Sequence, residues 1–392
     1  MNKLDDNRRV AEQLVELVKT GTTDMAPDVM RVPSAHYLDP TIWRGEIDTL
    51  FMRLPLLAGV SAEIPNPGDY KAYDYVGQPL LITRQKDGSL RAMLNVCKHR
   101  AMLLAEEGSG NCRRFSCPYH GWTYNADGSL IAVAERSKFG QVEPEELALT
   151  QLPVFERHGF IFVVLTPGQE ADFENHVGPM ADDMAYLNLA GAYFVGTREI
   201  QGPNWKVAYD GYLEGYHFAA AHPETINLRT FSNVMQFDAF GPHLRVGYPQ
   251  RSILEQLGKV APEKWGECET DGYDFVRTFF PNVSIFAAPE IIQISQMIPG
   301  NTPEASRTIM YFLGRDPNPS ADEIVKLNEM ADFLSGVVER EDYGAGLKVQ
   351  RGLASSAASH VIFGRNELGN QHFHKWVEYY MSKDKSLPTP VL

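Results

Sequence analysis

The sequence predicts an α+β protein in two parts, an all-β unit followed by an antiparallel sheet that a long helix closes. Its 392 residues are more than one hydrophobic core usually serves. Between residues 43 and 167, short apolar runs alternate with turn signals rich in Gly, Pro, Asn and Asp. Further strand-like runs then precede a helical pattern that begins near Ser320 and continues past Val349.

Composition limits the class of partner. Lys and Arg number 36 against 50 Asp and Glu, and the formal charge of -14 argues against binding to nucleic acid or anionic membranes. No apolar run approaches the ~18 residues of a membrane span, and the charged N-terminus lacks the apolar core of a signal peptide. We therefore expect a cytoplasmic protein.

The elements predict three segments along the chain. Val10, Leu14, Leu17 and Val18 recur at helical spacing, which predicts an amphipathic helix over residues 7–19. Buried strands are predicted for the runs PLLITR and FIFVVL in the all-β unit. The expected boundaries are 1–42 for an N-terminal helical segment that packs on the last domain, 43–168 for the all-β domain, and 169–392 for the last domain.

The last domain opens after a junction-like stretch, PGQEADFENHVGP (167–179). We predict a helix around residues 205–221 and strands in SIFAAPEIIQISQMI. The final KDKSLPTPVL is expected to be a frayed tail.

A first metal site is indicated by Cys97-x-His99, then seventeen residues, then Cys117-x-x-His120. Two thiolates and two imidazoles fit an asymmetric [2Fe–2S] cluster, with cysteines on one iron and histidines on the other. A structural zinc site is the alternative, but zinc fingers usually group like ligands together, whereas each loop here mixes them.

The other cysteines are Cys112 and Cys268, and four cysteines in so long a chain make no disulfide framework. We expect Cys112 to be a free thiol.

A second site is indicated by Glu214, His217 and His222. Glu214 and His217 share a face of a helix, together with Asp210. His217 and His222 are five residues apart, about 140° out of alignment on an ideal helix, so a shared ion requires an irregularity or a helix end. Taken alone, these residues are weak evidence for a metal.

Both motifs, in this order, resemble those of Rieske non-haem iron oxygenases, the catalytic α subunits of ring-hydroxylating enzymes. The resemblance rests on C-x-H…C-P-Y-H-G-W and on N-W-K followed by a carboxylate-x-Tyr-His-x₄-His run, and it covers about residues 43–373. It implies a Rieske domain and a helix-grip catalytic domain, with one [2Fe–2S] cluster, one mononuclear Fe(II) and O₂ as co-substrate. Ala101 stands where the family commonly has Gly, and we expect only a change in local packing.

By this resemblance, His217 and His222 bind the mononuclear iron. The third ligand is expected in the segment 337–355, where we choose Asp342, with Glu341 as the competitor and Glu339 behind it. Glu214 matches the family's bridging carboxylate, which would contact His120 of a neighbouring subunit and orient His217 or its partner histidine. Asp210 either faces the active site or is a solvated residue.

The implied function is a terminal oxygenase component that takes electrons from a reductase or ferredoxin, and indirectly from NAD(P)H. We expect mono- or dihydroxylation of a small organic substrate, aromatic first, as in aromatic hydrocarbon catabolism. Oxidative O- or N-demethylation is the alternative within the family. From other classes, a Rieske electron carrier and a helix-grip ligand-binding protein are alternatives. A homotrimer is expected, with or without a small β subunit.

Two further sets of residues are candidates for binding. The substrate pocket is predicted to include Phe218, Phe231, Phe286, Ile292 and Ile294, and a substrate carboxylate could meet Arg229, Arg245 or Arg277. Around the cluster loops, a docking patch for an acidic electron donor is one interpretation of a basic group, and a solvated face is the other; the group comprises Lys98, Arg100, Arg113 and Arg114.

Overall fold

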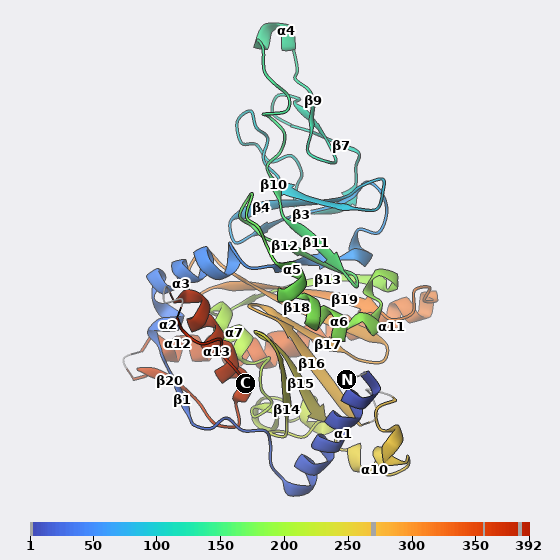
Figure 1. The fold of residues 1–392 in the computed structure, drawn as a ribbon, viewed down its shortest axis with the longest axis vertical. Helices are drawn as coiled ribbons and strands as arrows, with labels where there is room; N and C mark the ends of the chain where they lie inside the picture. Colours follow the sequence, from blue (N-terminus) through green and yellow to red (C-terminus); the bar gives the residue numbers. More distant parts are fainter. Residues whose placement is uncertain (1–2, 268–271, 356, 383–385) are drawn as a thin grey trace. The chain divides into compact units, whose positions relative to one another are not determined.

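The computed structural model describes residues 3–267, 272–355, 357–382 and 386–392. The chain divides into two compact units. One comprises the N-terminal 50 residues and everything from Ala192 onward, and the other is Phe51–Gly191. Figure 1 shows the strands and helices of both units.

The Phe51–Gly191 unit is built almost entirely from short antiparallel strands, as its turn-rich sequence predicts. Its three sheets have the strand orders β10-β5-β4-β3-β6, β11-β12-β2 and β7-β8-β9. The strands are β2 (Leu56–Val60), β3 (Asp69–Tyr75), β4 (Gln78–Arg84), β5 (Leu90–Leu94), β6 (Gly108–Asn111), β7 (Arg114–Ser116), β8 (Thr123–Asn125), β9 (Leu130–Ala132), β10 (Gln151–Leu152), β11 (Val154–Arg157) and β12 (Phe160–Val163). The predicted runs PLLITR and FIFVVL are β4 and β12, and both are largely buried.

The end of this unit differs from the predicted boundary, because residues 169–191 group with it. It continues through α5 (Phe173–His176) and α6 (Gly178–Asp183). Arg157 on β11 forms ion pairs with Glu174 at 2.6 Å and with Asp182 at 2.6 Å. These contacts attach both helices to β11. A further short helix, α4 (Arg136–Phe139), lies in the same unit.

The other unit contains a seven-stranded antiparallel sheet with the order β13-β19-β18-β17-β16-β15-β14. Its strands are β13 (Tyr193–Gly202), β14 (Gln236–Phe240), β15 (His243–Pro249), β16 (Tyr273–Phe279), β17 (Val283–Ala287), β18 (Ile291–Pro299) and β19 (Ser306–Gly314). A separate two-stranded sheet pairs β1 (Met30–Pro33) with β20 (His360–Phe363). The antiparallel sheet confirms the predicted α+β class.

Helices pack against this sheet. α11 (Ala321–Val337) contacts β13, β18 and β19, and it runs through a π-helical turn, Val338–Tyr343, into α12 (Gly344–Leu353). The long helical region predicted from Ser320 is therefore present, and Ser320 caps it through a reciprocal hydrogen bond with Glu323. Figure 1 labels α11, α12 and the strands of this sheet.

The N-terminal helix is also confirmed, as α1 (Lys3–Thr20). Its buried Val10 and Leu14 pack in a cluster with Phe275 of β16. The remaining helices of this unit are α2 (Ala35–Leu38), α3 (Pro40–Glu46), α7 (Trp205–Asp210), α8 (Phe218–Ala221), α9 (Ile226–Arg229), α10 (Ile253–Leu257) and α13 (Leu368–Met381). None of the described helices is both long and apolar enough to cross a bilayer.

Candidate active site

The two predicted cluster loops have the same backbone design. In both, the cysteine N–H donates to the carbonyl five residues later, and its own carbonyl accepts from the N–H four residues later. That fourth residue is Ala101 in one loop and Gly121 in the other, and both have positive φ, 57° and 71°. Ala101 therefore occupies a left-handed position that favours glycine, so the departure affects backbone strain as well as packing.

The four predicted ligands lie at the tips of these loops. Cys97 and Cys117 are buried and free of disulfides, and the rings of His99 and His120 are 4.5 Å apart. The Nδ1 atoms of both histidines are buried, yet no described residue forms a hydrogen bond with them. Buried, unpaired imidazole nitrogens beside two buried thiols are the donor set that a mixed-ligand iron–sulfur cluster requires.

Tyr124 adds a hydrogen bond to one thiol. Its buried hydroxyl lies 3.5 Å from Sγ of Cys97 and accepts from the N–H of Lys98 at 3.0 Å. Sequence reasoning missed this residue. Cys112 is free, as predicted, and its Sγ donates to the carbonyl of Arg114 at 2.6 Å. Cys268 lies outside the described residues.

The predicted helix over residues 205–221 is wrong, because it breaks. α7 ends at Asp210, and α8 is a single turn with His217 and His222 as its flanking residues. Asp210, Glu214 and His217 consequently share no helical stripe. The two histidines, five residues apart, can approach one another because they lie at the two ends of α8. The π-helical irregularity occurs instead at the third ligand.

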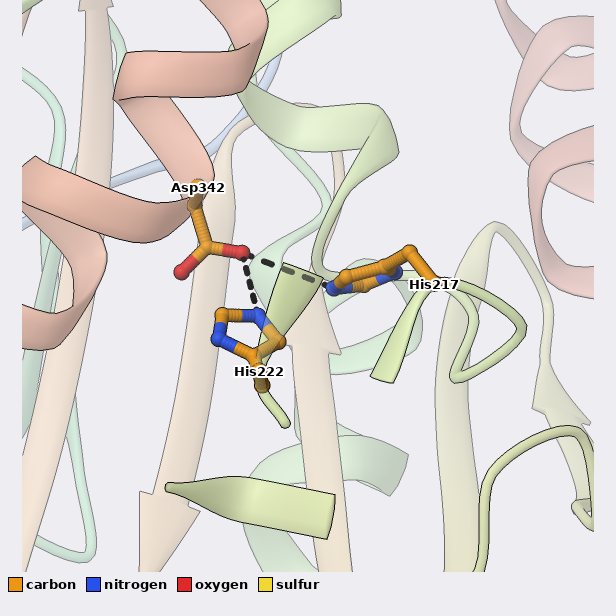
Figure 2. A group of neighbouring side chains, drawn as sticks. All are labelled: His217, His222 and Asp342. Carbon is orange, nitrogen blue, oxygen red and sulfur yellow. Dashed lines mark hydrogen bonds and ion pairs between the residues drawn. The ribbon is translucent and has the colours of Figure 1, made fainter. Parts of the chain in front are cut away.

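His217, His222 and Asp342 bring one ligand atom each within 4.8 Å of one another. Oδ1 of Asp342 lies 3.0 Å from Nε2 of His222 and 3.5 Å from Nε2 of His217 (Figure 2). The π-helical turn carries Asp342 to this point. Two imidazoles and one carboxylate that converge in this way can hold a divalent iron and leave other positions open.

A second carboxylate binds each imidazole at Nδ1, the nitrogen that does not face Asp342. Nδ1 of His217 is hydrogen-bonded to Glu214, and Nδ1 of His222 lies 2.6 Å from Oε2 of Glu341. Glu341 thus serves as the partner of a ligand, while Asp342 faces the metal position. Glu339, the third candidate, is exposed.

Charge is concentrated at this site. Burial would lower the pKa of His217, but hydrogen bonds to Asp342 and Glu214 raise it to about 10 in the absence of a metal. Burial would raise the pKa of Asp342, whereas its contacts with His217 and His222 hold that pKa below its usual value. Such an arrangement favours the ionised carboxylate that a cation needs.

A cavity of ≈ 390 Å³ opens beside the three converging residues. It is lined by His217, His222 and Asp342, and farther away by aromatic and polar side chains that include Phe218, Tyr248, Phe286, Gln293, Arg229 and Asp274. The predictions for Phe218 and Phe286 agree with this lining.

Three pocket predictions are wrong. Ile292 and Ile294 are buried on β18, but Gln293 between them lines the cavity, so the two isoleucines point to the opposite face of the sheet. Phe231 packs instead with the α1 cluster, where the guanidinium of Arg251 lies 5.2 Å from its ring.

Of the three arginines predicted to meet a substrate carboxylate, Arg229 alone lines this cavity. Arg245 is buried and paired with Asp6 at 2.6 Å and with Asp238 at 2.7 Å, so it is structural. Arg277 is buried with its guanidinium 4.6 Å from the ring of Phe275.

A second cavity, of ≈ 220 Å³, borders Glu214, His217 and Asp342 from another side. Asp210 and Glu367 also line it. Asp210 is held by the hydroxyl of Tyr37 at 2.8 Å and by Nε2 of His374 at 3.0 Å. Asp210 therefore lies near the metal position but is engaged by side chains of α2 and α13.

Comparison with known proteins agrees with this geometry. The model of the family described as "Rieske [2Fe-2S] domain" matches residues 55–153, and that of "Ring hydroxylating alpha subunit (catalytic domain)" matches residues 191–383. The N,N-dimethyl phenylurea N-demethylase subunit alpha of Sphingobium sp. (strain YBL2) is 32% identical over 80% of this chain and 74% of its own length. The chain belongs to the Rieske oxygenase family. It is an oxygenase subunit that carries a [2Fe–2S] cluster and a mononuclear iron and uses O₂ with electrons from a reductase or ferredoxin.

Other relatives of this Rieske oxygenase match most of its length. The chloroplastic choline monooxygenase of Beta vulgaris is 27% identical over 89% of this chain and 77% of its own length. Among solved structures, the quaternary ammonium Rieske monooxygenase CntA with an inhibitor superposes with a TM-score of 0.79, at 23% identity, over 91% of this chain and 97% of that one. This superposition shows that the chain shares the fold of that structure.

Proposed function

We propose that this Rieske oxygenase is a monooxygenase that oxidises an N-methyl carbon and so removes the methyl group. One relative carries this reaction in its name, the N,N-dimethyl phenylurea N-demethylase subunit alpha. Choline, carnitine and N,N-dimethyl phenylurea, which appear in the names of relatives 27%, 31% and 32% identical, all bear methyl groups on nitrogen. Hydroxylation of an aromatic ring, our first expectation, becomes the second candidate, favoured by an anthranilate 1,2-dioxygenase large subunit 29% identical over 52% of the chain.

The lining of the cavity supports an N-methylated substrate. The ring of Phe218 lies 5.0 Å from that of His217 and 5.9 Å from that of His222, and it packs against Tyr248 at 5.4 Å. Aromatic faces next to the metal position attract the polarised methyl groups of an amine or ammonium. They also keep water away from the carbon that reacts.

The protein residues have separable roles in this proposal. His217, His222 and Asp342 would hold the iron, which when bound supplies the binding and activation of O₂. Glu214 and Glu341 fix the orientation of the imidazoles, because each accepts from an Nδ1–H and leaves Nε2 as the ligand atom.

The proposed reaction balances with the electrons that the cluster delivers. One oxygen atom of O₂ enters the C–H bond of the methyl group, and the other leaves as water with two electrons and two protons. The hydroxymethyl group on nitrogen then breaks at its C–N bond, which releases formaldehyde and leaves an N–H.

We further propose that electrons pass between chains of an oligomer, with a homotrimer as the expected form. The second cavity is acidic, with Asp210, Glu214 and Glu367 on its wall. The cluster loops carry exposed Lys98 and Arg100, so opposite charges favour docking of one copy's cluster loops at another copy's Glu214. The same exposed basic residues could steer a reductase or ferredoxin.

The test is product analysis with purified protein, a reductase and NADH. We expect N,N-dimethyl phenylurea to give formaldehyde in proportion to the O₂ consumed. The His217→Ala variant should give none while it keeps the Rieske absorption, and Arg44→Gln, an exposed residue that pairs with Asp48 outside the cavity, should behave as wild type. Ring hydroxylation of anthranilate without formaldehyde from any N-methyl compound would contradict the proposal.

A further inference from the structure

A charged pair, Arg229 and Asp274, lies on the wall of the substrate cavity. Nη2 of Arg229 donates to Oδ1 of Asp274 at 2.9 Å, and Nε2 of Gln250 donates to its Oδ2 at 3.0 Å. Among the described residues, Asp274 is the only side-chain partner of this guanidinium, and the Arg229 side chain is 49% exposed. Its other N–H groups are therefore available to a ligand.

The pair lies away from the metal position, at the end of a row of aromatic rings. Phe218 contacts both histidines, and Tyr248 contacts Phe218. Tyr248 on β15 is in turn directly opposite Asp274 on β16. Residues directly opposite one another on neighbouring strands share a face of the sheet. A substrate that places its methyl group at the metal thus extends past Phe218 and Tyr248 toward Arg229 and Asp274.

The charges decide which group this end accepts. A substrate carboxylate would pair with Arg229 but would also meet the negative charge of Asp274 and of Glu224, which lines the same cavity. An ammonium group would meet the positive charge of Arg229. An amide avoids both conflicts, because its carbonyl accepts from the guanidinium and its N–H donates to the carboxylate. Each oxygen of Asp274 accepts one hydrogen bond, from Arg229 or from Gln250, and can accept another.

We propose that Arg229 and Asp274 recognise an amide group (–CO–NH–) at the end of the substrate remote from the methyl group that is oxidised. This inference rests on the proposed N-demethylation and specifies its substrate class. Burial raises the pKa of Asp274 even though Arg229 and Gln250 act against it, which agrees with a poorly solvated pair that prefers a neutral partner.

Three probes with the same N-methyl groups test the proposal: para-(dimethylamino)benzamide, its methyl ester and its carboxylate. Binding is measured by calorimetry on the full-length purified protein without reductase, so that no turnover occurs. The amide should bind about tenfold more tightly than the ester, which lacks the donor, and than the carboxylate, which adds a charge.

Two variants and a control sharpen the test. Asp274→Asn should weaken the amide about tenfold and strengthen the carboxylate, so that their order inverts. Arg229→Gln should weaken the amide and the ester alike. Arg44→Gln replaces an exposed arginine that pairs with Asp48 outside the cavity, and it should change nothing.

Equal binding of the three probes, or an unchanged order in Asp274→Asn, would overturn the inference. Melting temperatures of each variant identify loss of folding, and an inversion of preference cannot come from unfolding. The proposed function is judged separately, because formaldehyde from the ester would support N-demethylation even if the amide had no advantage.

Discussion

Nδ1 of His222 lies 2.6 Å from Oε2 of Glu341, while Nε2 of the same ring lies 3.0 Å from Oδ1 of Asp342. Two adjacent carboxylates thus take opposite edges of one imidazole. The π-helical turn that contains both residues makes this possible, since it widens the local backbone. Asp342 and Glu341, which the sequence leaves as competing candidates for the third iron ligand, therefore have different roles.

Glu341→Gln should therefore weaken the iron site without abolishing it. The amide oxygen can still accept from Nδ1 of His222, but it stabilises the ring less well, and we expect iron affinity to fall by roughly 10- to 100-fold. Titration of chelator-treated protein with Fe(II) measures this. Glu339→Gln is the matched control, because Glu339 is exposed on the same turn and should leave the affinity unchanged. A larger loss for Glu339 than for Glu341 would refute the assignment.

Metal binding should depend on pH through His217. Burial would lower the pKa of His217, but its contacts with Asp342 and Glu214 raise that pKa to about 10. Iron, in contrast, binds the neutral imidazole. We expect Fe(II) affinity to rise as the pH increases toward 10, by up to about tenfold per pH unit for each proton released.

In the metal-free protein the same contacts of His217 also stabilise the fold. This contribution is complete at pH values below the ordinary histidine pKa of 6.5. That contribution is lost as the pH rises toward 10. Glu214→Gln lowers the pKa of His217 and should flatten the pH dependence of Fe(II) affinity. An affinity that does not change between neutral and alkaline pH would count against this account.

Backbone strain at Ala101 predicts an unusual stabilising substitution. Ala101→Gly should raise the free energy of unfolding of the Rieske unit by about 1 kcal/mol, because glycine adopts φ of 57° without a Cβ penalty. Gly121→Ala, at the equivalent position of the other loop, should lower it by a similar amount. A Cβ there would meet Ala134 at an ordinary 3.6 Å, so the cost is in the backbone. Thermal loss of the Rieske absorption measures both, and shifts of equal sign would disprove the equivalence of the loops.

Tyr124 should raise the reduction potential of the cluster. Its hydroxyl, 3.5 Å from Sγ of Cys97, stabilises the more negative reduced state. Tyr124→Phe should lower the potential by roughly 40 mV, since one hydrogen bond contributes about 1 kcal/mol and a tenfold change corresponds to 59 mV for one electron. Spectroelectrochemical titration tests this, and a potential that stays the same or rises would show that the hydrogen bond has no such effect.

The sequence predicts ligand residues better than it predicts the cavity. Motif spacing and order indicate both metal sites, because ligands for a metal require particular residue types close together. Which side chains line the cavity depends on the face of the sheet to which each points, and β18 is buried on both faces. Its isoleucines are therefore no guide to direction, and Gln293 is the residue that lines the cavity.

Two local structures were also beyond pattern reasoning. The sequence keeps helical spacing across residues 205–221, so the pattern does not mark the break between the end of α7 at Asp210 and the start of α8 at Phe218. α13 (Leu368–Met381) was not predicted, although its His374 contacts Asp210 near the metal position. That contact joins residues 164 positions apart, and no local pattern reports it.

Iron content of Asp342→Ala tests the central claim most directly. Protein purified without oxygen should contain about three irons per chain in the wild type, two in the cluster and one held by His217, His222 and Asp342. The variant should contain about two, with the Rieske absorption intact. Three irons per chain in Asp342→Ala would contradict the account.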